Sequence, residues 1–220
     1  MSYQLFAHPF SSYSWKAMIA FHEKGLAYDL QMVEDQDVMA RLRRHWPLGK
    51  FPVLVDSDGE GGAPVIEATT IIEYLDLRHG ERAPLIPANA VDALDVRFMD
   101  RVFDNHVMTP MQAIVTEALP GITPDPARVE RAGQALDTIY GWLEVRLAGR
   151  EWACSHGFSL ADCAAAPSLF YADWVRPIPE SFPLLRAYRA RLNARPSVAR
   201  CIEGARPYRH YFPLGAPDRD

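Results

Sequence analysis

The sequence has little of what a disulfide framework or a metal site requires. Its 220 residues include only three cysteines, Cys154, Cys163 and Cys201, and none of them forms a C-x-x-C pair. An odd number of isolated cysteines favours free thiols in a reducing compartment. The seven histidines form no H-E-x-x-H or comparable ligand set, so we expect no metal site.

Long apolar runs and an excess of positive charge are also missing. No stretch approaches the roughly 18 consecutive apolar residues of a membrane span, and the N-terminus lacks the basic-then-apolar pattern of a signal peptide. The formal net charge is −5, with acidic and basic residues interspersed, so there is no nucleic-acid-binding footprint. We therefore expect a cytoplasmic protein that binds neither membranes nor nucleic acids.

What is present is a globular composition in two unlike halves. Hydrophobic residues make up 49% of the chain and charged residues 23%, which suits one large or two ordinary domains. Residues 1–82 predict an α/β domain of order βαβαββα, because short alternating runs are separated by helical ones. Its strands are expected at 3–7, 28–33, 52–55 and 64–67, and its helices at about 11–24, 37–45 and 70–79. The last of these helices is expected to open with a capping box at Thr70 and Glu73.

The second half predicts an all-α domain over residues 92–220, after a linker at 83–91. Helices are expected at about 92–119, 125–147, from 159 onward, 182–194 and 197–204, with an irregular aromatic tail at 207–213. Pro110 predicts a kink or break in the first of them. The helix that starts at Ser159 is apolar nearly all round, so it is expected to be the buried centre of this domain.

A proline inside a strand-like run is the most informative local feature of the chain. Residues 49–55 (GKFPVLV) predict a strand whose entry is blocked by Pro52, which cannot donate to a sheet ladder and can follow a cis peptide bond. Such an entry would leave the Val53 backbone unpaired and open to an extended peptide ligand. Glu67 could bind the ammonium group of that ligand. Taken alone, each feature is more simply explained as a conformational stop that binds no ligand, whereas the two together favour a binding site.

A serine cluster, Ser11-Ser12-Tyr13-Ser14-Trp15, precedes the first predicted helix. Ser11 or Ser12 is therefore expected at the N-cap, where backbone N–H groups are free and the helix dipole is positive. A hydroxyl at this place could donate to a bound thiolate, and both effects would lower the pKa of the thiol. The alternative is that the serines only cap the helix.

Four segments together resemble the cytosolic glutathione transferase family over nearly all of the chain. Residues 11–15 are similar to the start of its serine-type classes, especially the zeta class, whose motif reads S-S-C-S-W. Residues 47–54 match the P-x-G-x-V-P-x-L loop that carries a cis-proline in this family. Residues 67–75 match its E-S-x-x-I-x-x-Y-L segment, and residues 159–162 match the capping box of its helical domain.

This resemblance implies a thioredoxin-like N-terminal domain that binds glutathione and an all-α domain that binds a small hydrophobic electrophile, with no metal. By position, Ser11 would stabilise the thiolate, with Ser12 next in line. Val53 would pair with the cysteinyl backbone, Glu67 with the γ-glutamyl ammonium, and Lys50 with the glycyl carboxylate. The implied glutathione-binding residues are Lys50, Phe51, Pro52, Val53, Glu67, Ala68 and Thr69. The expected electrophile pocket comprises Phe10, Tyr13, Phe103, Val107 and Met111, with Tyr171, Trp174 and Tyr211 as candidates to complete it.

The chain departs from the family pattern at two of these places. Ala68 replaces the usual serine that binds the γ-glutamyl carboxylate, so N–H groups of the next helix or the Thr69 hydroxyl would have to serve. Tyr13 replaces the cysteine of the zeta motif, which argues against zeta-type isomerase activity. Tyr3 and Tyr13 stay open as alternative thiol-activating groups.

We interpret the sequence as a homodimeric glutathione transferase of the detoxification type, with glutathione as co-substrate. One alternative is a zeta-like glutathione-dependent isomerase, suggested by the serine motif. The other is a non-catalytic binding or regulatory protein that keeps the fold, suggested by Ala68.

Overall fold

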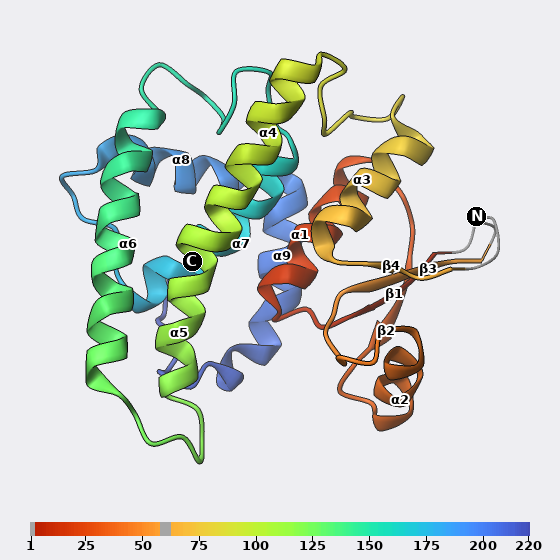
Figure 1. Cartoon of the computed structure of the whole chain (residues 1–220), viewed down its shortest axis with the longest axis horizontal. Helices are drawn as coiled ribbons and strands as arrows, with labels where there is room; N and C mark the ends of the chain where they lie inside the picture. Colours follow the sequence, from red (N-terminus) through yellow and green to blue (C-terminus); the bar gives the residue numbers. More distant parts are fainter. Residues whose placement is uncertain (1–2, 58–62) are drawn as a thin grey trace.

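The computed structural model describes residues 3–57 and 63–220. Its N-terminal part has the predicted βαβαββα order (Figure 1). The elements are β1 (Tyr3–Ala7), α1 (Ser12–Glu23), β2 (Asp29–Met32), α2 (Gln36–His45), β3 (Val53–Asp56), β4 (Val65–Ile66) and α3 (Ala68–His79). The predicted fold class is confirmed, whereas the domain boundaries at 82 and 92 stay predictions.

The sheet has the strand order β2-β1-β3-β4, with β1 parallel to β2 and antiparallel to β3. Side chains of a strand alternate between its two faces, and here each face has its own core. Leu5 and Leu54 join the large core with α1 and α3, whereas Phe6 and Val53 pack against Leu42 of α2. Figure 1 shows α1 and α3 between the sheet and the helical domain.

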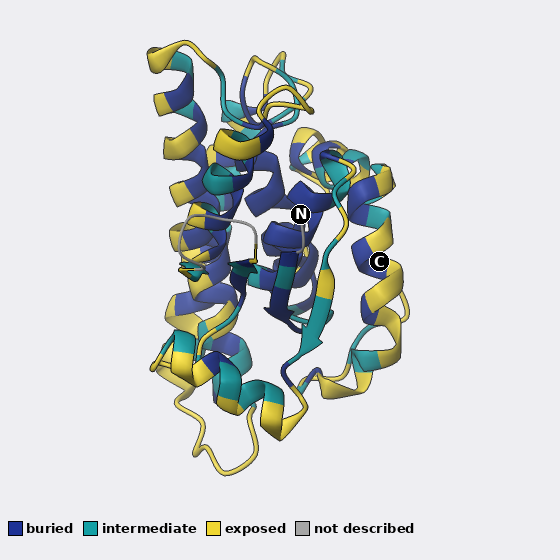
Figure 2. Cartoon of the chain, turned by 90° about the vertical axis from the view of Figure 1, so that its right-hand side faces the viewer, coloured by how far each residue is buried: buried dark blue, intermediate teal, exposed yellow. Residues whose placement is uncertain are grey.

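The rest of the chain is helical, as predicted. Its elements are α4 (Ala90–Val102), the π-helical turn η2 (Phe103–Met108), α5 (Thr109–Glu117), α6 (Pro126–Arg146), α7 (Leu160–Val175), α8 (Pro183–Ala194), α9 (Pro196–Ala205) and the 3₁₀ helix η3 (Arg206–Tyr211). The predicted capping box of Ser159 and Asp162 begins α7, and this helix is buried over nearly its whole length. Figure 2 shows buried residues along the central strands and helices, with exposed residues on the outer faces.

The predicted break near Pro110 takes the form of the wide turn η2. Proline lacks an N–H and its ring collides with the carbonyl four residues earlier, so the interior of a regular α-helix is an unfavourable place for it. Pro110 instead lies in the first turn of α5, directly after η2. Of the apolar positions at helical spacing upstream, Val102 and Phe103 are buried but Leu94 and Phe98 are exposed.

Two local expectations are wrong. The helix α3 begins at Ala68 rather than at Thr70, so Thr70 and Glu73 lie inside the helix and do not cap it. The tail is not irregular, because residues 206–211 form η3. Tyr208 and Tyr211 of η3 pack against the His8 ring, with ring centroids 4.7 and 6.0 Å away, and these contacts hold the tail on the N-terminal domain.

Lys24 fastens the end of α1 to the end of α3. Its side chain is fully buried, and its Nζ lies 2.6 Å from Asp76 Oδ1. The same Nζ donates to the carbonyls of Arg82 and Ala83, while the Asp76 carboxylate accepts from the backbone N–H groups of Leu85 and Ile86. One buried ion pair therefore fixes the course of the chain that leads from α3 to α4.

Within the described ranges, no helix combines the length and apolarity needed to cross a bilayer.

Replacing Lys24 with methionine should lower the free energy of unfolding by about 3–5 kcal/mol, because Asp76 would be left as an uncompensated buried charge. Denaturant unfolding measures this change. Arg44→Met is the control, since Arg44 is exposed on α2 and should change stability by less than about 0.5 kcal/mol. A loss below about 1 kcal/mol at Lys24 would show that the pair is not an anchor.

Candidate functional site

Two unlike pockets meet between the domains. The first, of about 310 Å³, is called the polar pocket and is lined by Tyr13, Trp46, Lys50, Phe51, Pro52, Ile66, Glu67, Ala68, Arg101, Asp104, Asn105 and Gln112. The second, of about 240 Å³, is called the apolar pocket and is lined by Phe10, Ser11, Ser12, Met111, Gln112, Val115, Leu119, Tyr171, Tyr211, Phe212 and Pro213. Gln112 belongs to both linings, so the pockets adjoin.

Ser11, one of the two serines expected at this position, is the N-cap of α1. Its Oγ accepts a hydrogen bond from the Ser14 N–H at 3.3 Å. A hydroxyl that caps a helix uses only an acceptor position, so its own proton is left to donate to a ligand. Ser12 lies beside it in the same lining. Capping and ligand binding are therefore compatible roles for Ser11.

The loop before β3 contains the predicted cis peptide bond between Phe51 and Pro52. The expected free backbone at Val53, however, is wrong. β3 is an inner strand, and Val53 is fully buried opposite both Phe6 of β1 and Ile66 of β4. Among the described residues, the Phe51 backbone has no hydrogen-bond partner in a strand, turn or loop, and Phe51 lines the polar pocket. The accessible backbone is therefore at Phe51.

Glu67 stands at the N-cap of α3 with a left-handed backbone, at φ 73°. A non-glycine residue in this region is strained, and such strain gathers at functional sites. The Glu67 side chain makes no capping hydrogen bond and lines the polar pocket. The strained turn therefore presents an exposed carboxylate to the pocket, as the sequence suggested.

Behind the polar pocket lies a buried ion cluster. Lys16 of α1 is 1% exposed, and its Nζ lies 2.5 Å from Asp100 Oδ1 and 2.7 Å from Asp104 Oδ2. Arg101 Nη2 also donates to Asp104 Oδ2, at 2.7 Å. Burial is the main cause that raises the pKa of Asp104 above its usual value, and the Lys16 charge opposes it.

The Thr69 hydroxyl belongs to this cluster and not to the pocket. It accepts from Lys16 Nζ at 2.8 Å and from Arg101 Nη2 at 2.6 Å, and it donates to Asp100 Oδ2 at 3.1 Å. A hydroxyl has one proton, and this one is already given to a carboxylate. Thr69 therefore cannot donate to a ligand carboxylate, contrary to one of the sequence hypotheses.

Tyr3 and Tyr13, the alternative thiol-activating groups from the sequence analysis, lie in different environments. Tyr3 is buried, with its hydroxyl 2.8 Å from His79 Nε2, and it lines neither pocket. Tyr13 lines the polar pocket, where burial, followed by the nearby Asp104 charge, raises its pKa to about 12. Tyr13 therefore stays protonated at neutral pH and can donate a hydrogen bond but cannot act as a base.

The residues expected for the electrophile divide into three groups. Phe10 and Met111 line the apolar pocket, and so do the candidates Tyr171 and Tyr211. Phe103 and Val107 are fully buried in the main core instead. Tyr13 lies on the polar side.

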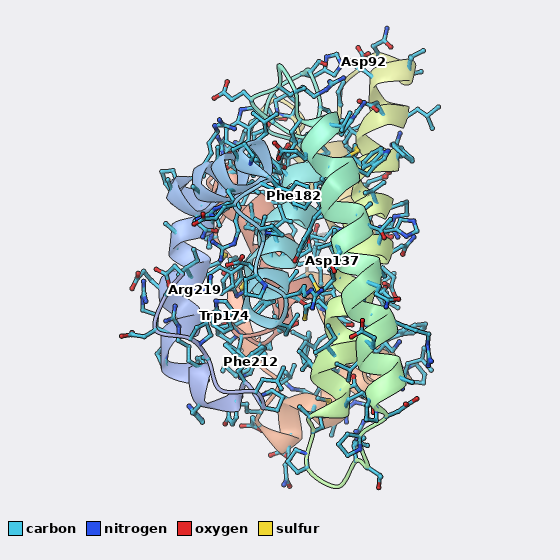
Figure 3. The ribbon with its side chains drawn as sticks, turned by 90° about the vertical axis from the view of Figure 1, so that its left-hand side faces the viewer. Asp92, Asp137, Trp174, Phe182, Phe212 and Arg219 are labelled. Carbon is cyan, nitrogen blue, oxygen red and sulfur yellow. The ribbon has the colours of Figure 1, made fainter. Side chains whose placement is uncertain are left out.

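Trp174 packs behind the apolar pocket without lining it. Its ring centroid lies 5.1 Å from that of Phe212, which does line the pocket, and the two are close together in Figure 3. Trp174 therefore supports the pocket wall.

Sequence reasoning missed several pocket residues. The Trp46 indole Nε1 is buried without a hydrogen-bond partner and belongs to the polar lining, beside the exposed Lys50. Its position next to the loop motif could have identified it. Arg101, Asp104 and Gln112 come from distant helices, and no local pattern indicates them.

Comparison with known proteins identifies the family. The profile "Glutathione S-transferase, N-terminal domain" matches residues 10–78, and "Glutathione S-transferase, C-terminal domain" matches residues 104–196. The chain belongs to the glutathione S-transferase family. The predicted family is thereby confirmed. In this chain the polar pocket is lined by the N-terminal domain and by the facing residues of α4, η2 and α5.

Its relatives carry different names. FtsZ-localized protein A of Caulobacter vibrioides is 26% identical over 217 residues, 94% of this chain and 95% of that protein. Glutathione S-transferase F6 of Arabidopsis thaliana is 24% identical over 210 residues, with coverages of 90% and 98%. A glutathione S-transferase from Methylobacillus flagellatus, solved with glutathione bound, is 27% identical with a TM-score of 0.79 over 90% of this chain and 98% of that one.

In the part of the chain that the structure describes, no three His, Cys, Asp or Glu side chains gather so as to hold an ion.

The strained turn at Glu67 can be tested by comparing Glu67→Gly with Glu67→Ala. Both remove the carboxylate, but glycine adopts a positive φ without strain, so Glu67→Gly should be more stable by about 1 kcal/mol in denaturant unfolding. The same pair of changes at the exposed Leu77, inside α3, should give the opposite sign, because glycine weakens a helix by about 1 kcal/mol. Equal stability of the two Glu67 variants would contradict the strain.

Proposed function

We propose that the protein binds glutathione in the polar pocket and transfers it to a small hydrophobic electrophile held in the apolar pocket. The observation that carries this proposal is the meeting of the two pockets at the first turn of α1, where Gln112 joins both linings and Ser11 and Ser12 belong to the apolar one. A peptide thiol needs polar partners and an apolar electrophile needs an apolar wall, and the two must lie side by side to react.

The polar pocket offers a partner for each part of the tripeptide. The exposed Lys50 and the unpaired Trp46 indole N–H would bind the glycyl carboxylate, since both are donors. The free Phe51 backbone would pair with the cysteinyl residue in the manner of an added strand. Glu67 would bind the γ-glutamyl ammonium.

The chemistry would proceed from the thiolate. The thiol proton leaves to water, and the sulfur lone pair forms a bond to the electrophilic carbon, with a leaving group expelled or a conjugated double bond protonated. The Ser11 hydroxyl would donate to the thiolate while the N-terminus of α1 adds its positive field, so the pKa of the thiol falls. Tyr13, with its pKa at about 12, would serve as a neutral donor.

A second candidate is a binding or regulatory protein that has the glutathione transferase fold but no transferase activity. The relative named FtsZ-localized protein A, which aligns over 94% of this chain, favours it, as does Ala68. Retention on immobilised glutathione and turnover of a substrate panel separate the two functions. A cis-enone in the same panel tests the zeta-like isomerase.

Ser11→Ala should lower kcat/KM about 10- to 100-fold, because a hydrogen bond to a charged group contributes about 1.5–3 kcal/mol. The ultraviolet absorbance of the bound thiolate should report a higher thiol pKa. Ser11→Thr keeps both the hydroxyl and the cap, so it should retain most of the activity.

Full activity in Ser11→Ala together with a loss in Ser12→Ala would move the thiol-activating role to Ser12. Full activity in both variants would refute activation by serine altogether.

The oligomeric state and the compartment belong to the same proposal. We expect a homodimer, and a groove of about 800 Å³ between α4, α5 and α6 supports it, because Phe98 and Trp142 in its lining are 49% and 41% exposed. Figure 3 shows α5 and α6 side by side on this face. A second copy would cover an apolar patch that a monomer leaves in water.

The three free, buried cysteines support a cytoplasmic location.

Phe98→Arg should convert the dimer to a monomer in light scattering, because it places a charge in the apolar contact. Leu184→Arg on α8 is the control, since Leu184 is also partly exposed (43%) but lies outside the groove. A wild-type protein that is monomeric at micromolar concentration would contradict the homodimer.

A further inference from the structure

The turn that connects β1 to α1 runs from His8 to Ser11 and is held by hydrogen bonds to its backbone. The Ser11 N–H donates to the His8 carbonyl at 3.0 Å, which closes the turn. The Phe10 N–H donates to His8 Nδ1, also at 3.0 Å. The Trp15 indole donates to the Pro9 carbonyl, and the Trp15 N–H donates to the Ser11 carbonyl. The N–H of His8 donates to a serine hydroxyl of α1. The Phe10 carbonyl is the remaining polar group of the turn.

The partner of the Phe10 carbonyl is Tyr171, which comes from α7 in the helical domain. The Tyr171 hydroxyl donates to this oxygen at 2.9 Å. Burial raises the pKa of Tyr171 well above its usual value, so the hydroxyl keeps its proton and stays a donor. The Tyr171 ring also packs edge-on against the Phe10 ring, with the centroids 5.5 Å apart. The helical domain therefore grips the residue that directly precedes Ser11.

These contacts fix the peptide plane between Phe10 and Ser11. A peptide is planar, and both polar ends of this one are bound, the oxygen by Tyr171 and the N–H by the His8 carbonyl. The orientation of the plane sets the backbone φ of Ser11, which is −85°. The backbone angles in turn limit the rotamers of a side chain. The direction of the Ser11 hydroxyl therefore depends on a plane that Tyr171 helps to hold.

We propose that Tyr171 is a positioning residue for the Ser11 hydroxyl and acts through the Phe10 carbonyl. This inference rests on the proposed function, in which Ser11 donates to the glutathione thiolate. A hydrogen bond weakens steeply when its angle departs from the preferred one, so thiolate stabilisation requires a hydroxyl that is held in place. The single proton of the Tyr171 hydroxyl is already given to a carbonyl, so Tyr171 does not itself donate to the sulfur. Thiol activation in the N-terminal domain thereby depends on contact with the helical domain.

Tyr171→Phe tests the inference, because it removes the hydroxyl and keeps the ring in the apolar pocket. The thiolate absorbance, titrated with pH in the complex with glutathione alone, should report a higher thiol pKa than in wild type. At neutral pH kcat/KM should fall about tenfold, since misplacement by about 1 Å can cost up to about 100-fold. This loss should shrink above the thiol pKa, where the sulfur ionises without help. Below the thiol pKa, glutathione should bind as tightly as to wild type, because Tyr171 does not line the polar pocket.

A double mutant tests whether Tyr171 acts through Ser11. Adding Tyr171→Phe to Ser11→Ala should leave the thiol pKa where Ser11→Ala alone places it, because no hydroxyl is left to position. A further rise would show that Tyr171 acts on the sulfur by another route and would overturn the inference. An unchanged thiol pKa in Tyr171→Phe, beside a raised one in Ser11→Ala, would overturn it too and would leave the proposed function standing.

Tyr140→Phe is the matched control. Tyr140 is also buried, and its hydroxyl donates to the backbone carbonyl of Arg176 at 3.1 Å, but it lines neither the polar nor the apolar pocket. Both variants should lose a similar amount of stability in denaturant unfolding, because each leaves a carbonyl without its donor. Only Tyr171→Phe should change the thiol pKa. An equal rise in both variants would indicate a general loosening of the protein and contradict the positioning role.

Hydrogen exchange of the Ser11 amide gives a second measurement that does not depend on turnover. The Ser11 N–H should exchange faster in Tyr171→Phe than in wild type, because its peptide plane has lost one of two anchors, whereas Tyr140→Phe should exchange like wild type. Unchanged protection in Tyr171→Phe would overturn the inference. Failure of wild type to bind glutathione, or an unchanged thiol pKa in Ser11→Ala, would refute the proposed role of Ser11 and this inference with it.

Discussion

The burial of the Lys16 ammonium is the constraint on which the rest of the structure depends. A buried cation without partners would cost several kcal/mol, and the carboxylate of α1, Glu23, is paired with Arg195 instead. The partners of Lys16, Asp100 and Asp104, come from the helical domain. The two domains must therefore dock for Lys16 to be neutralised, and docking creates the cleft whose walls become the pockets. Architecture and site follow from the same contact.

The wide turn η2 decides what each side of that cleft contains. A π-helical turn adds a residue to the helical repeat and shifts the phase of everything after it. Asp104 and Asn105 lie in η2 and line the polar pocket, whereas Met111 lies after Pro110 and lines the apolar pocket. A single helical run thereby contributes to both pockets and to the core.

Local signals made most of the fold and half of the site predictable. The cap at Ser11, the cis bond at Pro52 and the capping box at Ser159 each depend on a few neighbouring residues. Val53 was misassigned because the residues around it do not indicate the order of the strands, and it is this order that buries β3 between β1 and β4. Phe103 and Val107 were misplaced because they lie in η2, where a regular helical period does not hold. Arg101 and Asp104 reach the site only through tertiary docking, which sequence spacing does not reveal.

The unusual use of lysine has a practical consequence. The chain has three lysines, and the side chains of Lys16 and Lys24 are almost completely shielded from water. Lys50 is the one whose amine is open to solvent, and it stands at the mouth of the polar pocket. Any reagent that attaches dyes, resins or crosslinkers through lysine side chains will therefore settle at the entrance to the site. Immobilising the folded protein through this side chain would obstruct that entrance.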